Sequence, residues 1–380
     1  MSIEMSIDTV RKAVAQSASA IAVTARLAPV SGNKVLPPTY AGDGQSSPPR
    51  HNMTKPGPDG LSSWCSLDSP GSCANRAEQA LVGLGLDLDP LRVDFGNGEV
   101  LSTLQLPHRV FDAVLRDSQL SGVAFRNCDI GKAVIAATPA RAAALLHYDP
   151  GSLVFGAWDS TGLGANSRPR TKWARALTCE ISATRLEPVS LAGYRLDPIG
   201  IQGKDYVWVE EADGTLRQAT EDEVQPHDKG GLPRATDKSK EYPRLVKASK
   251  ANHGNATPPL IPKGVLVHGD ISLNATLSLS RLRRYSFGDE TAAGRLLLAL
   301  MGLYGVLAVL NDGLALRSGC DLAVSEHLVE LIGLGTRVPV ALTLTEVEAA
   351  LRAQVKTVSL HPPVNFTPSK GLRDIRNASL

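Results

Sequence analysis

Alternating apolar and polar positions mark two strands in the predicted core. One segment alternates from Ile21 to Leu27, and a second from Val265 to Leu279 predicts one long strand or a hairpin. The most apolar stretch, Leu296 to Leu310, is too short to cross a bilayer comfortably and contains glycines. It predicts a buried helix, which helical spacing extends back to Thr291.

Helical spacing and short alternating runs predict the other regular elements. Ser72 is the expected N-cap of a helix that ends at Gly83. A hairpin is expected over 92–106, around the turn at 96–98. The remaining expected helices cover 5–18, 110–117, 131–146 (interrupted at Thr138-Pro139) and 345–355, and the remaining strands cover 153–155, 179–186 and 314–319. Residues 356–380 are expected to be irregular.

The central stretch from Leu153 to Leu186 combines such elements with local charge. Its apolar start leads through Gly156 to Trp158-Asp159-Ser160, then to a Gly/Asn/Ser-rich loop and a basic segment that contains Trp173. Strand, glycine loop, basic hairpin and strand, in this order, can present cations to a polyanion from a rigid base. We therefore expect the rest of the chain to support a basic hairpin over 156–175.

Two long polar segments interrupt the regular pattern. Residues 28–70 are rich in Pro, Gly and Ser and predict a long loop, either functional or partly disordered. Residues 196–263 turn from acidic to basic, with seven Lys or Arg and three Asp or Glu over 228–250, and predict a variable insertion. The whole chain, 1–380, is interpreted as one domain. The order of elements predicts an α+β fold with a ferredoxin-like (RRM-like) βαββαβ core.

Composition narrows the classes of function. With 40 Lys and Arg against 38 Asp and Glu, the net charge of +2 gives no bulk attraction to nucleic acid, so an electrostatic site must be local. Aromatic residues make up only 4% of the chain, which disfavours the reading of single strands by many stacked bases. Five scattered cysteines without a CxxC pair, and an N-terminus without an apolar signal core, indicate a cytoplasmic protein.

The motifs predict no metal or cofactor. The histidines are isolated, without HxH or HExxH spacing, and the aspartates at 43, 68, 129 and 159 do not pair. A GxxxxGK[ST] loop and a GxSxG elbow are absent, and Gly162-Leu163-Gly164 has the wrong continuation for a Rossmann turn.

Local basic clusters are the candidate chemistry. In the hairpin, arginine forks could bind phosphate while Trp173 stacks on a base or ribose; the alternative is a solvated loop whose Trp packs on the body. Asn75-Arg76 and His108-Arg109 fall at expected helix starts, which favour anions, and ordinary capping is the alternative. Arg281, Arg283 and Arg284 follow a strand, so at least one must face solvent. His108 could also act as a general acid or base, but no second catalytic group accompanies it.

Five sets of residues, in order along the chain, resemble one known family. They are Arg26-Leu27 with 37–40 (PPTY), 72–78 (SCANRAE), 107–109 (PHR), 155–161 (FGAWDST) and 175–181 (RALTCEI). Over roughly residues 20–285, they are similar to the large backbone subunit of the type I-G (formerly I-U) CRISPR Cascade complex, a member of the RAMP superfamily. Gly71 and Cys73 depart from the more polar pair expected at those positions.

The resemblance implies a modified ferredoxin-like palm with large inserted loops, 196–263 being the thumb or finger candidate. It implies a non-catalytic subunit that stacks head-to-tail along CRISPR guide RNA and supports guide–target pairing in antiviral defence. Implied partners are the guide RNA, the target DNA paired to it, further copies of the chain, other Cascade subunits and a helicase-nuclease recruited later, with no membrane. Contacts to guide phosphates would be independent of sequence and sensitive to salt.

Under this resemblance, the candidate RNA-contacting residues combine the basic clusters with their neighbours in the motifs. They are Arg26, Arg50, Asn75, Arg76, His108, Arg109, Trp158, Ser160, Arg168, Arg170, Lys172, Arg175, Arg281 and Arg283. Two other functions stay open. One is a RAMP endoribonuclease that processes guide-RNA precursor with His108 or a loop aspartate. The other is a helical scaffold that binds no nucleic acid, with the basic clusters as solvated faces.

Overall fold

The computed structural model shows an α+β protein, as the sequence predicts, and its sheets are curled and mainly antiparallel. The described residues are 3–16, 18–40, 50–96, 98–159, 172–189, 206–219, 245–247 and 264–379. The chain divides into two compact units. Unit 1 contains Met1–Pro38, Asn52–Glu187 and Val265–Leu380, and unit 2 contains Thr39–His51 and Pro188–Gly264. The expected insertion at 196–263 lies within unit 2.

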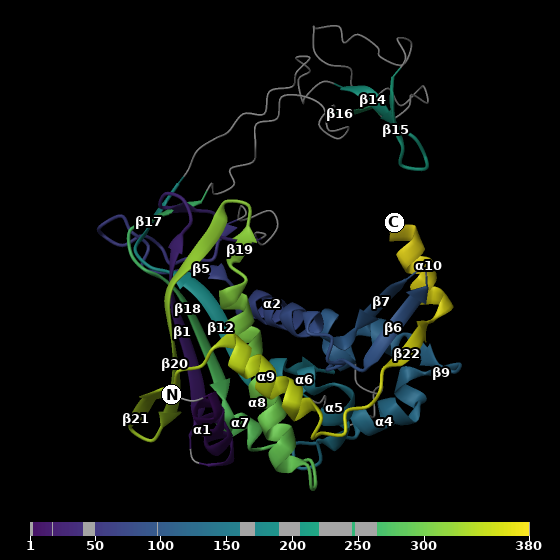
Figure 1. Cartoon of the computed structure of the whole chain (residues 1–380). Coiled ribbons are helices and arrows are strands. Elements are labelled where there is room, and N and C mark those ends of the chain that lie inside the picture. Colours follow the sequence, from purple (N-terminus) through teal and green to yellow (C-terminus); the bar gives the residue numbers. More distant parts are fainter. Residues whose placement is uncertain are drawn as a thin grey trace, which may run out of the picture. The chain divides into compact units, whose positions relative to one another are not determined.

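Unit 1 is organised around a large antiparallel sheet with the strand order β19-β20-β1-β18-β12-β5, in which β21 also pairs with β20 (Figure 1). The strands are β1 (Ala20–Pro29), β5 (Cys65–Asp68), β12 (Leu177–Ala183), β18 (Ile271–Ser278), β19 (Leu314–Arg317), β20 (Cys320–Gly333) and β21 (Thr336–Pro339). Alternation sets the two faces, because Val23 and Ala25 of β1 are buried whereas Arg26 is exposed. The strand predicted at 21–27 is confirmed as β1. The prediction of one long strand or a hairpin over 265–279 is wrong in part, because the segment forms β17 (Val265–Val267) in a small separate sheet and β18, which pairs with β1.

Helices cover the buried face of this sheet (Figure 1). Helices α2 (Pro70–Gly83) and α8 (Thr291–Asn311) contact its strands, with the short α7 (Leu279–Leu282) ahead of α8. Helices α1 (Ile3–Ala15) and α9 (Leu344–Val355) pack against α8. By length and composition α8 could cross a membrane, but 89% of its apolar window is buried inside the protein, so the predicted buried helix is confirmed. Gly305 lets α8 approach α2, because a Cβ there would lie 2.8 Å from the Cβ of Ala77.

The large sheet is curled, and side chains connect its two edge strands, β5 and β19. Arg76 of α2 donates to the carbonyl of Leu316 in β19 at 2.9 Å, and its Nε lies 3.1 Å from Oδ2 of Asp68 in β5. Arg317 of β19 lies 3.6 Å from the other oxygen of Asp68, a side chain that is fully buried. These three charged residues (Asp68, Arg76 and Arg317) are termed the seam.

A second sheet of unit 1 has the strand order β7-β6-β22-β8-β9. Its strands are β6 (Leu91–Gly96), β7 (Glu99–Ser102), β8 (Ser118–Leu120), β9 (Val123–Ala124) and β22 (Val364–Pro368). The predicted hairpin at 92–106 is confirmed by β6 and β7, whereas the prediction of an irregular tail is wrong. Strand β22 pairs in parallel with β6, and helix α10 (Lys370–Ser379) follows it beside this sheet (Figure 1).

Short elements complete the two units. Between β7 of the second sheet and β12 of the large sheet, the chain also forms other short helices and strands. They are η1 (Thr103–Gln105), η2 (Arg109–Phe111), α3 (Ala113–Arg116), η3 (Phe125–Asn127), α4 (Asp129–Ile135), α5 (Ala143–Tyr148), α6 (Pro150–Phe155), β10 (Ala157–Trp158) and β11 (Lys172–Trp173). A small sheet joins β13 (Leu186–Pro188), β17 (Val265–Val267) and β2 (Lys34–Val35). In unit 2, β14 (Tyr206–Glu210) pairs with β15 (Leu216–Gln218) and β16 (Leu245–Lys247), and β3 (Thr39–Tyr40) pairs with β4 (Arg50–His51).

The segment at 153–155 is not the predicted strand but the last part of α6. Pro150 occupies the first turn of this helix, and the side chain of Asp149 accepts a hydrogen bond from the backbone N–H of Ser152. An apolar run of three residues is too short to distinguish a strand from a buried helix.

Two other helix predictions are corrected, one in where the helix starts and one in its continuity. Helix α2 begins at Pro70, because Ser69 rather than Ser72 is the N-cap. The predicted helix at 110–117 is divided into η2 and α3, because Asp112 caps the second part. The predicted interruption within 131–146 is confirmed by the gap between α4 and α5.

Candidate nucleic-acid interface

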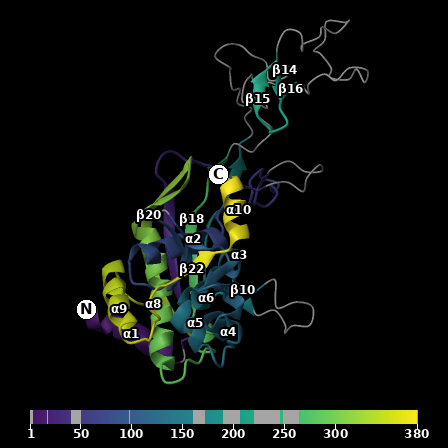
Figure 2. The same cartoon turned by 90° about the vertical axis from the view of Figure 1, so that its right-hand side faces the viewer.

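The hairpin base, formed by β10 and β11, is a short antiparallel ladder that pairs Trp158 with Lys172 (β10 is labelled in Figure 2). Gly156 precedes it with a φ of +83°, and a Cβ there would lie 2.8 Å from Cγ of Arg175 and 2.9 Å from the carbonyl oxygen of Trp173. Only glycine permits this backbone conformation and this close approach without strain. The glycine of the central stretch therefore brings Trp158 beside β11.

The two tryptophans of the hairpin base have opposite environments. Trp173 is buried and its ring centre lies 5.7 Å from that of Tyr285, so the predicted stacking role of Trp173 is incompatible with its packing. Trp158 is 46% exposed, and Nζ of Lys172 lies 5.9 Å from the centre of its ring. The accessible aromatic surface of the hairpin base is thus that of Trp158.

Four exposed cations surround the hairpin base. Lys172 and Arg175 flank Trp173 in the chain, and Arg281 and Arg284 precede Tyr285, against which Trp173 packs. The backbone N–H of Ser278 donates to the carbonyl of Ala176 at 2.8 Å, so the turn that carries Arg281 and Arg284 starts beside the end of the hairpin. Burial raises the pKa of Tyr285, and the charges of Arg281 and Arg284 partly offset that rise. Within the described part of the chain, these four residues, termed the hairpin-base cation patch, form no ion pair.

A buried ion pair fixes the chain directly after Trp158. Asp159 is 6% exposed and accepts two hydrogen bonds from Arg126, at 2.6 and 3.0 Å. Ala157 is buried as well, so Trp158 projects outward between two inward-facing neighbours. This alternation holds the indole at the surface.

Arg109 belongs to the interior instead of the predicted RNA surface. Its side chain is buried, its Nε lies 2.5 Å from Oε1 of Glu78, and it donates to the carbonyl of Gly156 at 2.7 Å. The guanidinium also lies 5.4 Å from the centre of the Phe155 ring. Arg109 therefore joins α2 to the turn before β10, and no phosphate reaches it while this network is intact.

The network contains two carboxyl groups whose titration is shifted. Burial raises the pKa of Glu78 to about 7 from its ordinary value of 4.5, although the charge of Arg109 and its hydrogen bond lower it. Burial also raises the pKa of Asp149, although the hydrogen bond from Ser152 lowers it. Burial outweighs the favourable partners at both carboxyl groups.

As pH rises, the free energy of unfolding of Glu78→Gln should increase relative to that of the wild type. Because the folded-state pKa is raised, the stability contributed by Glu78 is complete below about pH 4.5 and is lost as pH rises through about 7. The amide has the same shape but no titration in this range. Urea unfolding of both proteins between pH 5 and 8 should show that the difference in free energy of unfolding changes in favour of Glu78→Gln as pH rises. A shift towards the wild type would mean that the ion pair outweighs burial.

Three other predicted residues have structural surroundings that limit contact with RNA. The guanidinium of Arg76 is held in the seam. Arg283 donates to the carbonyls of Ala18 at 2.6 Å and Ala13 at 3.4 Å, and so holds the end of α1. Asn75 is exposed but lies in the second turn of α2, away from the free N–H groups of the helix start that its predicted role required.

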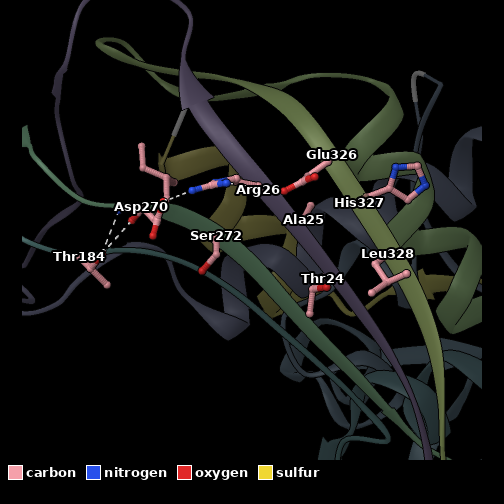
Figure 3. Close-up of a pocket in the computed structure, with 10 residues that line it drawn as sticks. Thr24, Ala25, Arg26, Thr184, Asp270, Ser272, Glu326, His327 and Leu328 are labelled. Atoms are coloured by element: carbon pink, nitrogen blue, oxygen red, sulfur yellow. Dashed lines mark hydrogen bonds and ion pairs between the residues drawn. The ribbon is translucent and has the colours of Figure 1, made fainter. Parts of the chain in front are cut away.

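Arg26 lies on the exposed face of the large sheet, in a groove of about 670 Å³ (Figure 3). Figure 3 shows its guanidinium between two carboxylates, 2.8 Å from Oδ1 of Asp270 and 3.8 Å from Oε1 of Glu326. The hydrogen bond to Asp270 raises the pKa of Arg26. Because two carboxylates surround one guanidinium, the net negative charge of this groove disfavours the binding of a phosphate.

The remaining predicted residues are separate from the hairpin-base cation patch or cannot be placed. His108 is exposed at the start of η2, where its backbone N–H donates to Asp112 at 3.1 Å. Arg50 is exposed in β4 of unit 2. Ser160, Arg168 and Arg170 lie outside the described residues. Among the residues that the structure describes, no group of three or more His, Cys, Asp or Glu side chains could hold a metal ion.

The structure adds Tyr285 to the candidate set and, within the basic cluster at 281–284, favours the exposed Arg281 and Arg284 over Arg283. The sequence pattern indicates a strand end at 281–284, whereas the chain forms the helical turn α7. In a helical turn, residues three apart lie on one side, as Arg281 and Arg284 do. Ser278, whose side chain caps α7, is the local signal for this turn.

The comparison with known proteins concerns the segment that contains most of this site. No curated protein matches the chain. Residues 21–188 match the family of CRISPR-associated protein GSU0053. The matched segment runs from β1 to β13 and includes Trp158, Lys172 and Arg175. This similarity to a CRISPR-associated family supports a role for the chain in a CRISPR system.

Proposed function

We propose that the chain is a non-catalytic, guide-RNA-binding backbone subunit of a type I-G CRISPR Cascade complex in the cytoplasm. Copies would stack head-to-tail along the guide, hold it for pairing with target DNA, and assemble with the other Cascade subunits. The observation that carries the proposal is the hairpin-base cation patch beside the exposed Trp158. Trp158, Lys172 and Arg175 lie within the segment that is similar to a CRISPR-associated family.

The strand order of the large sheet supports a ferredoxin-like palm as part of this proposal. In the chain, α2 lies between β1 and β12, and α8 lies between β18 and β20. The sheet places these strands in the order β20-β1-β18-β12, all antiparallel. Counted along the chain, these are the fourth, first, third and second strands of a βαββαβ unit. RAMP proteins are expected to build their palm on such a unit.

The chemistry of the hairpin-base cation patch suits binding to an RNA backbone. Guanidinium groups bind phosphate through two parallel hydrogen bonds, and a lysine adds a compact positive charge. Phosphate contacts carry no sequence information, which suits a subunit whose guide differs from complex to complex. The near-neutral charge of the whole chain is compatible with this, because the patch is local.

Co-expression with a repeat–spacer transcript tests the proposal. The purified chain should carry RNA, which the ratio of absorbance at 260 and 280 nm detects. In size-exclusion chromatography it should elute as a large assembly that nuclease treatment does not dissociate. A monomer without RNA would overturn the backbone role. Cleavage of the repeat RNA that His108→Ala abolishes would point instead to the endoribonuclease.

The triple variant Lys172→Glu/Arg281→Glu/Arg284→Glu should weaken binding to guide RNA by at least about tenfold. It should also reduce the slope of log affinity against log salt by about 2, because each lost phosphate contact on a single strand contributes about 0.7. Arg175 is kept, because its charge lowers the pKa of the buried Glu78. Filter binding over a salt series measures both effects.

The matched control is Lys132→Glu/Lys356→Glu/Lys370→Glu. It makes the same change in charge at exposed lysines outside the hairpin-base cation patch. If both triple variants lose affinity equally, the attraction is a general effect of charge and the hairpin base is not the binding site.

A further inference from the structure

We propose that Trp158 is a stacking position for an unpaired nucleotide, with Lys172 holding a phosphate of the same strand. This inference rests on the proposed function, since it assumes that the chain binds RNA. It adds that the ligand at the hairpin base is single-stranded, and that one of its bases lies on the indole.

Trp158 is prepared for such a contact by its neighbours. Ala157 and Asp159 are buried on either side of it, and the Arg126–Asp159 pair anchors the following backbone. Pairing with β11 and the glycine turn at Gly156 fix the preceding backbone. The indole is therefore already ordered at the surface, which reduces the entropy cost of stacking.

The surroundings of the indole favour a nucleotide over a protein partner. An exposed aromatic ring is also common at protein interfaces, where charged residues are depleted from the core of the contact. Here an ammonium lies over the ring at 5.9 Å, and three arginines complete the hairpin-base cation patch. A base on the ring with phosphates on the cations satisfies both features together.

The geometry also points to an unpaired nucleotide. In a duplex, the faces of internal bases are covered by their neighbours, so an indole can stack only on an end or on an unstacked base. Stacking of a base on an aromatic side chain tolerates any sequence, because every base has a π-face. The contact would thus serve a changing guide as well as the phosphate contacts do.

Trp158→Ala should weaken binding of a fluorescein-labelled oligouridine by about 5- to 150-fold, the range that base–aromatic stacking gives. The salt slope should be unchanged, because no charge is removed. Trp158→Phe should retain most of the affinity. Binding of Trp158→Ala to a long RNA duplex, in which internal base pairs far outnumber the two ends, should be nearly unaffected. Lys172→Gln should reduce the salt slope by about 0.7. Fluorescence anisotropy with the full chain measures the affinities and the salt slopes.

Leu328→Ala is the matched control, because it removes another exposed apolar side chain, 43% exposed, from the groove around Arg26. Thermal unfolding of each variant verifies the fold. A 2-aminopurine base in the oligonucleotide should be quenched on binding to the wild type, and the quenching should be lost with Trp158→Ala.

The outcomes separate this inference from the proposed function. If Trp158→Ala binds oligouridine like the wild type, stacking is excluded while RNA binding stands. Equal losses on single strand and duplex would exclude the unpaired nucleotide. If the variant binds RNA normally but fails to assemble with other subunits, Trp158 contacts protein. If the wild type binds neither RNA, the proposed function itself fails.

Discussion

Glu78→Leu should lower the free energy of unfolding by about 3–5 kcal/mol, the usual cost of removing one partner from a buried ion pair. The guanidinium of Arg109 would stay buried beside an apolar side chain, and arginine cannot release its charge by losing a proton. The carbonyl of Gly156 would still accept a hydrogen bond from it, and no other acceptor for its side chain is found among the described residues. Urea unfolding at pH 8, above the raised pKa of Glu78, measures the loss.

The double variant Glu78→Leu/Arg109→Met should recover most of that stability, because two apolar side chains of similar volume can replace a buried pair. Glu78→Gln should lose much less than Glu78→Leu, since its amide oxygen still accepts from Arg109. Equal losses for the double variant and for Glu78→Leu would show that the shape of the site, rather than the unpaired charge, determines its stability.

Asp68→Leu should lower the free energy of unfolding by about 2–3 kcal/mol and loosen the seam. It would leave the guanidinium groups of Arg76 and Arg317 near each other without the carboxylate that separates them. The expected loss is below that for Glu78→Leu, because these side chains are 29% and 25% exposed and can reach water. Hydrogen exchange should then accelerate in β5 and β19, while β1 and β18 at the centre keep their protection.

Asp321→Leu is the matched control for the seam. This carboxylate is exposed on β20, next to β19, so its removal should change stability by no more than about 0.5 kcal/mol. Unchanged exchange in β5 and β19 after Asp68→Leu would show that backbone packing alone holds the two edges together.

Local patterns were sufficient for much of the fold. Alternation identified β1 and β18, and continuous hydrophobicity identified α8, because each pattern reports burial directly. The tail could not be found in this way, because β22 is ordered by pairing with β6, which lies far away in the sequence. The start of α6 could have been predicted from the sequence, since Asp149 followed by Pro150 is a local signal for a helix start.

The candidate site was predictable as a region but not residue by residue. The sequence located a basic hairpin with exposed Trp158 and Lys172, because charge, glycine and aromatic residues coincide there. It could not distinguish Arg175, which is exposed, from Arg109, which is buried. That difference depends on Glu78, which approaches Arg109 only after α2 has packed against the rest of unit 1.

The capped edges of the large sheet bear on how copies of the chain can associate. The N–H of Ser66 on the outer edge of β5 donates to Asn52, and the carbonyl of Leu316 in β19 accepts from Arg76. In the turn after β19, the carbonyl of Gly319 accepts from the N–H of Leu36. These bonds occupy backbone groups that a foreign strand would need for pairing at β5 and next to β19. If copies of the chain assemble along one RNA as proposed, the bonds would oppose edge-to-edge aggregation between them.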